Sequence, residues 1–220
     1  MIDDFSEIER FFEGINDLFS SRVDIYVIGG AALMKRGMKA ATKDIDIIVT
    51  GREEYLILQK ALQEAGFKGQ IPGKGYENMN LSQLFNKGDF RIDLFEKEVC
   101  GRFSLSEAMR IRSKNVIDLD NVKVHLCSNE DIFLFKTMTE REGDISDCMM
   151  IAKTQNPDWS IILSELKDQI KKSKRDVWIT WVGERFDILV DKKVDIPIME
   201  DINRLRNNYF DNLEMSQEHD

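Results

Sequence analysis

Two adjacent glycines end one apolar segment of the chain, and two alternating aspartates begin the next. The Gly29-Gly30 pair follows a run of β-branched and aromatic residues, and Asp44 and Asp46 alternate with isoleucine. Successive side chains of a β-strand point to opposite faces of its sheet. Asp44 and Asp46 therefore share one face at the start of a predicted strand over 45–49, whose apolar side chains pack on the other face. The glycines predict a tight turn from the preceding strand into a helix.

The face shared by the two aspartates favours a bound cation. Two neighbouring carboxylates repel each other, so one of them is driven toward protonation unless a positive charge lies between them. A divalent metal ion removes this conflict and prefers oxygen ligands of this kind. At the Gly29-Gly30 turn, backbone N–H groups are left to face a phosphate. A phosphate site beside a metal site is what phosphoryl or nucleotidyl transfer requires.

A two-metal site needs a third carboxylate, and Asp93 is the candidate. It lies in a predicted strand over 90–96, in which apolar residues alternate with Arg91 and Asp93. If this strand lies beside the one that follows Asp44, the three carboxylates converge on one spot. Asp93 would then also be placed to accept the proton of an attacking hydroxyl group.

Length and composition limit the class of protein. The 220 residues can form one large domain or two small ones, and 42% hydrophobic with 32% charged residues is typical of a soluble globular protein. No apolar run approaches the roughly 18 residues that span a bilayer, and the acidic N-terminus lacks the regions of a signal peptide. Three widely spaced cysteines fit neither a disulfide framework nor a zinc site. We therefore expect a cytoplasmic protein with no membrane partner.

The charge of the chain restricts its partners further. A net charge of −9 argues against a broad, non-specific DNA-binding surface, which needs clustered lysine and arginine. The densest basic run, residues 171–175, is interpreted as a solvated helix end or loop. A local basic groove is still compatible with this charge.

Two parts of the chain differ in their hydrophobic pattern. Short alternating segments interleaved with amphipathic ones predict an α/β domain over 1–127, and apolar residues at helical spacing predict a helical domain over 128–220. Strands are predicted over residues 23–28, 45–49, 81–85, 90–96, 116–119 and 122–126, with a loop over 68–80. Helices are predicted over residues 8–19, 31–38, 53–65, 104–111, 129–140, 144–154, 158–173, 175–190 and 198–214.

These residues together resemble the polymerase-β-type nucleotidyltransferase superfamily. Its pattern is a Gly-Gly or Gly-Ser turn, a spacer, Asp-x-Asp, and a third Asp on a later strand, as in Gly29-Gly30, Asp44, Asp46 and Asp93. Within the superfamily the chain is similar to small prokaryotic AbiEii-like members, whose founding members are toxins of toxin–antitoxin pairs. The resemblance implies an α/β (α+β) nucleotidyltransferase-like mixed sheet with flanking helices over 1–127, followed by a C-terminal helical part.

The same resemblance implies an activity and a set of roles. A nucleoside monophosphate would pass from an NTP to an acceptor, which is RNA, a protein or a small molecule, with Mg²⁺ or Mn²⁺ as cofactor and pyrophosphate as product. The catalytic residues and metal ligands would be Asp44, Asp46 and Asp93. The nucleotide-binding residues would be Gly29, Gly30, Lys43, Lys136 and Arg141.

A second block of residues supports the resemblance. It implies a helix whose Lys136 reaches the nucleotide phosphates, followed by an Arg-x-x-Asp-x-x-Asp element at Arg141, Asp144 and Asp147. The alternative for that element is a structural ion network between the two parts of the chain. The chain departs from many relatives at Ala40, where they carry arginine.

Two other functions stay open at this point. One is a non-catalytic nucleotide-binding module on the same fold. The other is a partner-binding module whose C-terminal helices bind an antitoxin or form a homodimer. His125, at the end of an apolar strand, is predicted to pack or cap rather than to catalyse.

Overall fold

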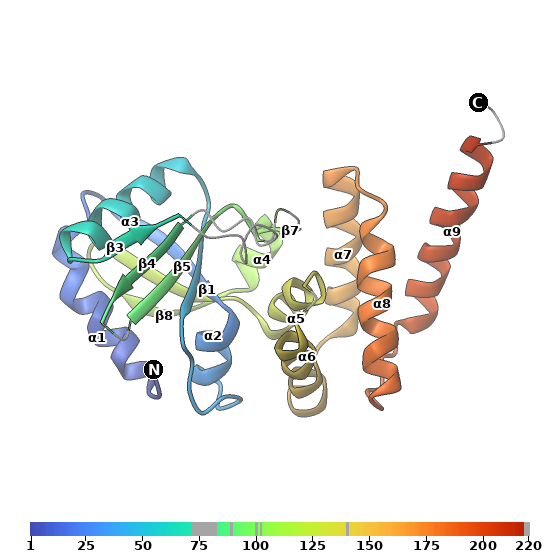
Figure 1. Ribbon diagram of the computed structural model, residues 1–220, viewed down its shortest axis with the longest axis horizontal. Helices are drawn as coiled ribbons and strands as arrows, with labels where there is room; N and C mark the ends of the chain where they lie inside the picture. Colours follow the sequence, from blue (N-terminus) through green and yellow to red (C-terminus); the bar gives the residue numbers. More distant parts are fainter. Residues whose placement is uncertain (72–82, 89, 100, 102, 140, 218–220) are drawn as a thin grey trace. The chain divides into compact units, whose positions relative to one another are not determined.

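The computed structural model describes residues 1–71, 83–88, 90–99, 101, 103–139 and 141–217 (Figure 1). Within it the chain divides into two compact units, Met1–Ser128 and Asn129–Asp220. The first unit combines a sheet with helices, and the second is helical.

The described residues of the first unit form a seven-stranded mixed sheet with the order β3-β4-β5-β2-β1-β9-β8. Its strands are β1 Val23–Ile28, β2 Ile45–Val49, β3 Lys68–Gln70, β4 Gln83–Lys87, β5 Phe90–Glu96, β8 Lys114–Asp118 and β9 Val122–Leu126. Strands β2 and β5 pair in parallel, as do β1 and β9, and the other neighbours are antiparallel. A short ribbon joins β6 Glu98–Val99 to β7 Phe103–Ser104.

The helices of the first unit are α1 Phe5–Ile15, α2 Gly29–Lys35, α3 Arg52–Glu64 and α4 Glu107–Arg112, with a 3₁₀ turn over Asn16–Leu18. Helix α1 begins with a capping box. The Asp4 carboxylate accepts a hydrogen bond from the Ser6 N–H at 2.8 Å, and the Glu7 carboxylate accepts from the Asp4 N–H at 3.3 Å. These two bonds satisfy backbone donors that the first turn of a helix leaves unpaired.

The two faces of the sheet differ in character. On one face, β-strand alternation gathers buried apolar side chains such as Ile25, Ile47 and Leu94. Helices α1 and α3 lie against this side of the unit, through contacts of α3 with β1 and β2 and of Phe11 with Phe90. The other face carries the carboxylates that the sequence singles out.

The second unit contains α5 Asn129–Thr137, α6 Glu142–Thr154, α7 Trp159–Ser173, α8 Trp178–Asp191 and α9 Met199–Gln217 (Figure 1, yellow to red). Phe133 of α5 is at the centre of its core, with ring centroids 5.4 Å from Trp159 and 5.7 Å from Phe186. Helix α9 is attached to α8 by Arg206, whose guanidinium donates to the Asp187 carboxylate at 2.6 and 3.1 Å. None of the described helices combines the length and the apolar character that crossing a membrane takes.

Several predicted elements have different bounds in the structure. The loop predicted over 68–80 is wrong at its start, because Lys68–Gln70 pairs with β4 as an edge strand; residues 72–80 lie outside the described part. The helix predicted over 104–111 begins only at Glu107, because Ser106 caps it by accepting from the Met109 N–H at 3.1 Å. The helix predicted after Gly30 already begins at Gly29.

Candidate active site

Asp46 and Asp93 are direct neighbours across the centre of the sheet. Parallel pairing of β2 with β5 aligns Asp46 with Asp93, so the two strands are adjacent, as a three-carboxylate site requires. Asp93 is only 2% exposed, whereas Asp46 and Asp44 are half-buried. Asp44 immediately precedes β2, and the strand alternation places it on the same face as Asp46.

The glycine turn lies against Asp46. Gly29 has a φ of +64°, and a Cβ atom on it would be 1.9 Å from Asp46 Oδ2. A Cβ on Gly30 would be 2.5 Å from Thr42 Oγ1. Only a residue without a side chain lets the Asp46 carboxylate approach the backbone so closely.

We expect Gly29→Ala to lower the free energy of unfolding by about 2–3 kcal/mol, because left-handed strain adds to the clash with Asp46. Urea unfolding followed by circular dichroism measures this loss. Gly37→Ala is the matched control, since Gly37 has a φ of +73° with no atom within 4 Å of an added Cβ. It should cost only the strain, about 1–2 kcal/mol. Equal losses in the two variants would contradict a steric role for Gly29 beside Asp46.

The segment before Asp44 is anchored by the N-terminus. Ile2 and Thr42 exchange two backbone hydrogen bonds, at 3.0 and 2.8 Å. The Thr42 hydroxyl donates to the Asp44 carbonyl at 3.0 Å. Both contacts orient the backbone that leads into Asp44. Sequence reasoning missed Ile2, since an isolated β-bridge leaves no periodic pattern.

The Asp93 carboxylate is held by an arginine of its own strand. Arg91 Nε donates to Asp93 Oδ1 and Arg91 Nη2 donates to Asp93 Oδ2, each at 2.7 Å. This is the two-pronged geometry in which a guanidinium binds a carboxylate most strongly. The sequence placed Arg91 on the correct face but gave it no role.

The donor atoms of this face fit a divalent cation in chemistry. Asp44, Asp46 and Asp93 offer carboxylate oxygens, the ligands that Mg²⁺ and Mn²⁺ prefer. In the part of the chain that the structure describes, however, no group of three or more His, Cys, Asp or Glu side chains is arranged to hold a metal ion. The residue types of a metal site are therefore present, and a pre-assembled three-ligand cluster is not found among the described residues.

Lys136 is buried in the second unit. Its side chain is 10% exposed, and Nζ lies 2.7 Å from Asp144 Oδ1 and 2.6 Å from Asp147 Oδ2. Arg141 Nε donates to Asp144 Oδ2 at 2.7 Å, and the Thr139 hydroxyl also donates to that oxygen. These contacts form an ion network within the second unit that includes Lys136, whereas the alternative predicted from the sequence placed it between the two parts of the chain.

Burial and charge act against each other in this network. Burial by itself lowers the pKa of Lys136, but the carboxylates of Asp144 and Asp147 outweigh it and raise that pKa above its ordinary value. Burial likewise raises the pKa of Asp144, but the Lys136 ammonium and hydrogen bonds from Arg141 and Thr139 hold that pKa below its ordinary value. Both groups therefore stay charged over a wide pH range.

His125 belongs to a second polar cluster on the carboxylate-bearing face. Its Nε2 lies 2.6 Å from Asp24 Oδ1, and its ring stacks on Tyr26 with centroids 4.8 Å apart. Burial, followed by the nearby Asp24 carboxylate, raises the pKa of Tyr26. The prediction that His125 packs is consistent with these contacts.

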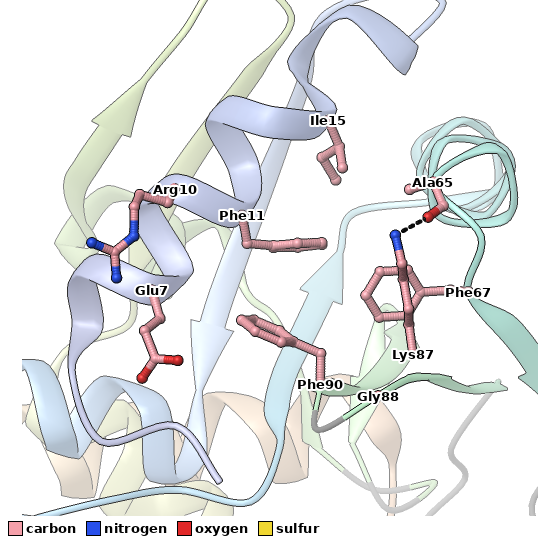
Figure 2. A pocket seen from close by; sticks show the side chains of 9 residues that line it. All are labelled: Glu7, Arg10, Phe11, Ile15, Ala65, Phe67, Lys87, Gly88 and Phe90. Carbon is pink, nitrogen blue, oxygen red and sulfur yellow. Dashed lines mark hydrogen bonds between the residues drawn. The ribbon is translucent and has the colours of Figure 1, made fainter.

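A cavity of about 530 Å³ opens on the opposite face of the sheet (Figure 2). Phe11 contributes to its wall with ring centroids 5.5 Å from Phe67 and 5.4 Å from Phe90. Since Phe90 alternates with Arg91 along β5, this cavity lies away from Asp93. It is therefore separate from the candidate active site.

The model of one protein family, described as nucleotidyltransferase of unknown function (DUF6036), matches residues 6–178. No curated protein matches the chain.

Three solved structures are similar to parts of the chain. The crystal structure of ANT(2")-Ia in complex with adenylyl-2"-tobramycin is 14% identical, with 77% of this chain and 98% of that chain covered and a TM-score of 0.49. The solution structure of the antibiotic-resistance factor ANT(2'')-Ia is 14% identical, with coverages of 98% and 97% and a TM-score of 0.44. An antigenic nucleotidyltransferase-like protein from Paracoccidioides brasiliensis is 15% identical, with coverages of 81% and 89% and a TM-score of 0.37.

Proposed function

This chain belongs to the DUF6036 family of nucleotidyltransferases of unknown function, and from that premise we propose that it moves a nucleoside monophosphate from an NTP to an acceptor, with release of pyrophosphate. The observation that carries the proposal is the alignment of Asp46 with Asp93 on neighbouring strands beside the Gly29 turn. Asp44 adds a third carboxylate to the same face. This arrangement supports a site for the charged phosphates of a nucleotide and their counter-ions.

We assign roles to the residues of this site. Asp44, Asp46 and Asp93 would hold Mg²⁺, or Mn²⁺ in its place. When bound, such an ion supplies positive charge to the phosphate oxygens on which negative charge develops. Gly29 and Gly30 keep the strand-to-helix turn free of side chains, so that the triphosphate can approach the backbone.

Positive side chains would complete the nucleotide site. Lys43 is exposed one residue before Asp44, so it can contact a phosphate bound at this site. For Arg141, whose side chain belongs to the second unit and is 59% exposed, the phosphate contact stays a prediction. Lys136 is buried between two carboxylates, which favours the structural role for it over the predicted phosphate contact.

Calorimetric titration tests the proposal directly. ATP, GTP, CTP and UTP, each with Mg²⁺, are titrated into the wild type and into an Asp44→Asn/Asp46→Asn double variant. Magnesium-dependent binding of at least one NTP, lost in the double variant, is the expected result. Metal-independent binding that survives both substitutions would instead support the non-catalytic nucleotide-binding alternative. If the folded protein binds no NTP, the partner-binding alternative is favoured.

Transfer is then followed with labelled NTPs. The three acceptor classes, RNA, protein and a small molecule such as an aminoglycoside, are offered in separate reactions. The resemblance to AbiEii-like toxins favours RNA or protein and adds an antitoxin as the expected partner. Sedimentation of the isolated chain distinguishes this partner from a second copy, because a strict monomer rules out the homodimer.

A further inference from the structure

Arg91 and Asp93 form a two-pronged ion pair in the candidate active site. Both oxygens of a carboxylate that is 2% exposed accept hydrogen bonds of 2.7 Å from one guanidinium. The Arg91 side chain is 27% exposed, so the pair is largely shielded from water. Charge-assisted bonds of this two-pronged kind are about twice as strong as neutral ones.

The position of Arg91 in the sheet brings it near the other carboxylates. Arg91 and Asp93 are two residues apart on β5 and therefore share a face. The register aligns Ile45 with Ile92 and Asp46 with Asp93. Extended by one residue, it places Asp44 opposite Arg91. The guanidinium therefore lies on the face where the three carboxylates meet.

The pair occupies the oxygens that a metal ion would use. An ion that coordinates Asp93 from the same side has to replace at least one of the two bonds from Arg91, and from any side it meets the positive charge of the guanidinium. The two bonds therefore block this side of the Asp93 carboxylate in the arrangement seen. The blocking group is part of the protein itself.

We infer that Arg91 is the internal counter-ion of the site and competes with the divalent ion for Asp93. In the metal-free protein the guanidinium neutralises Asp93 and keeps its carboxylate positioned. When a metal ion binds, the guanidinium leaves at least one Asp93 oxygen and remains nearby as a positive charge on the site face. This inference rests on the proposed function and assigns Arg91 a positioning role.

Direct metal binding tests this inference without any catalytic readout. Mn²⁺ is titrated into the full chain without nucleotide, and the free ion is followed by electron paramagnetic resonance. Arg91→Gln removes the competing charge, so it should bind Mn²⁺ about tenfold more tightly than the wild type. This factor corresponds to the free energy of one charge-assisted interaction that the metal ion no longer has to replace. Arg91→Lys keeps the positive charge but not the two-pronged geometry of the guanidinium. Its Mn²⁺ affinity should therefore lie between those of the wild type and of Arg91→Gln.

Two control variants separate competition from general charge effects. Arg52 pairs with Glu96, at the end of the same strand, at 3.2 Å. Arg52→Gln changes the net charge equally and should leave Mn²⁺ affinity unchanged. The double variant Arg91→Gln/Asp93→Asn should lose the gain in affinity, because the ligand is gone.

Thermal unfolding shows whether each variant folds and provides a second measure of Mn²⁺ binding. Since Arg91→Gln leaves a buried carboxylate without this partner, Mn²⁺ should raise its Tm more than it raises that of the wild type. If Arg91→Gln does not fold, the Mn²⁺-induced rise in Tm is compared between Arg91→Lys and the wild type instead.

The possible failures can be told apart. If the wild type binds Mn²⁺ and Arg91→Gln binds it no more tightly, the competition is disproved while the metal site stands. If no variant binds Mn²⁺, with or without a non-hydrolysable NTP analogue, the proposed metal-dependent function fails and this inference fails with it.

Discussion

Replacing Asp46 by asparagine is expected to lower the rate of nucleotidyl transfer by about a thousandfold or more, with the fold intact. Asparagine has nearly the same shape, so it can occupy the space beside Gly29, where an added Cβ would be 1.9 Å from Asp46 Oδ2. It lacks the negative charge that would bind a divalent ion opposite Asp93. Initial rates of pyrophosphate release and of label transfer measure the loss, and circular dichroism checks the fold.

Asp24→Asn is the matched control for this substitution. Asp24 lies on the same face of the sheet, on β1, but its carboxylate pairs with His125. Its side chain is about half exposed and is not part of the proposed site. Removal of its charge should change the rate by no more than about twofold, within the range expected for a surface substitution. A wild-type rate in Asp46→Asn would contradict the assignment of Asp46.

Lys136→Met is expected to lower the free energy of unfolding by about 3–5 kcal/mol. The substitution leaves the buried carboxylates of Asp144 and Asp147 without the ammonium that lies 2.7 and 2.6 Å from them. Urea unfolding measures the loss. Lys153→Met, in the exposed last turn of α6, the helix that carries Asp144 and Asp147, is the control and should change stability by less than about 0.5 kcal/mol. A Lys136 variant of normal stability that no longer binds NTP would instead support the phosphate-binding role.

The pH dependence of the stability lost in Lys136→Met follows from the directions in which folding shifts the pKa values of Asp144 and Lys136. The pKa of Asp144 is lowered by folding, so its contribution is present above the ordinary carboxyl pKa and is lost as pH falls through the folded value. The pKa of Lys136 is raised, so its contribution is present below the ordinary lysine pKa and is lost as pH rises through the folded value. The difference in stability between wild type and Lys136→Met should therefore be flat near neutral pH and shrink in acid.

The sequence predicted the strands of the site well because their patterns are periodic. Strands β1, β2, β5 and β9 have the predicted bounds, since alternating β-branched residues end at glycine, acidic or turn residues. Strand β3 was missed because Lys68–Gln70 is exposed and has no apolar residue. Edge strands of this kind are fixed by backbone pairing with a neighbour, which a single sequence does not reveal.

Side-chain partners were harder to predict than strands. Alternation along the strand places Arg91 and Asp93 on one face. The two-pronged ion pair between them, however, depends on their side-chain rotamers and on the register of β5 with β2. Lys136 follows the apolar run 132–135, where a lysine is usually at a helix surface. Its burial is stabilised by Asp144 and Asp147 of another helix, a tertiary contact that overrides the local preference.

The parallel pairing of β2 with β5 has a consequence for how the first unit folds. Helix α3 and strands β3 and β4 lie between the paired strands in the sequence, and β1 gains its second neighbour only from β9 at Val122–Leu126. Contacts between residues so distant in the chain slow folding, because the intervening segment must be closed first. During synthesis, a nascent chain that ends before residue 122 exposes β1 as an open edge. All residues of the carboxylate site are therefore synthesised before this edge is covered, because Asp93 precedes β9 in the chain.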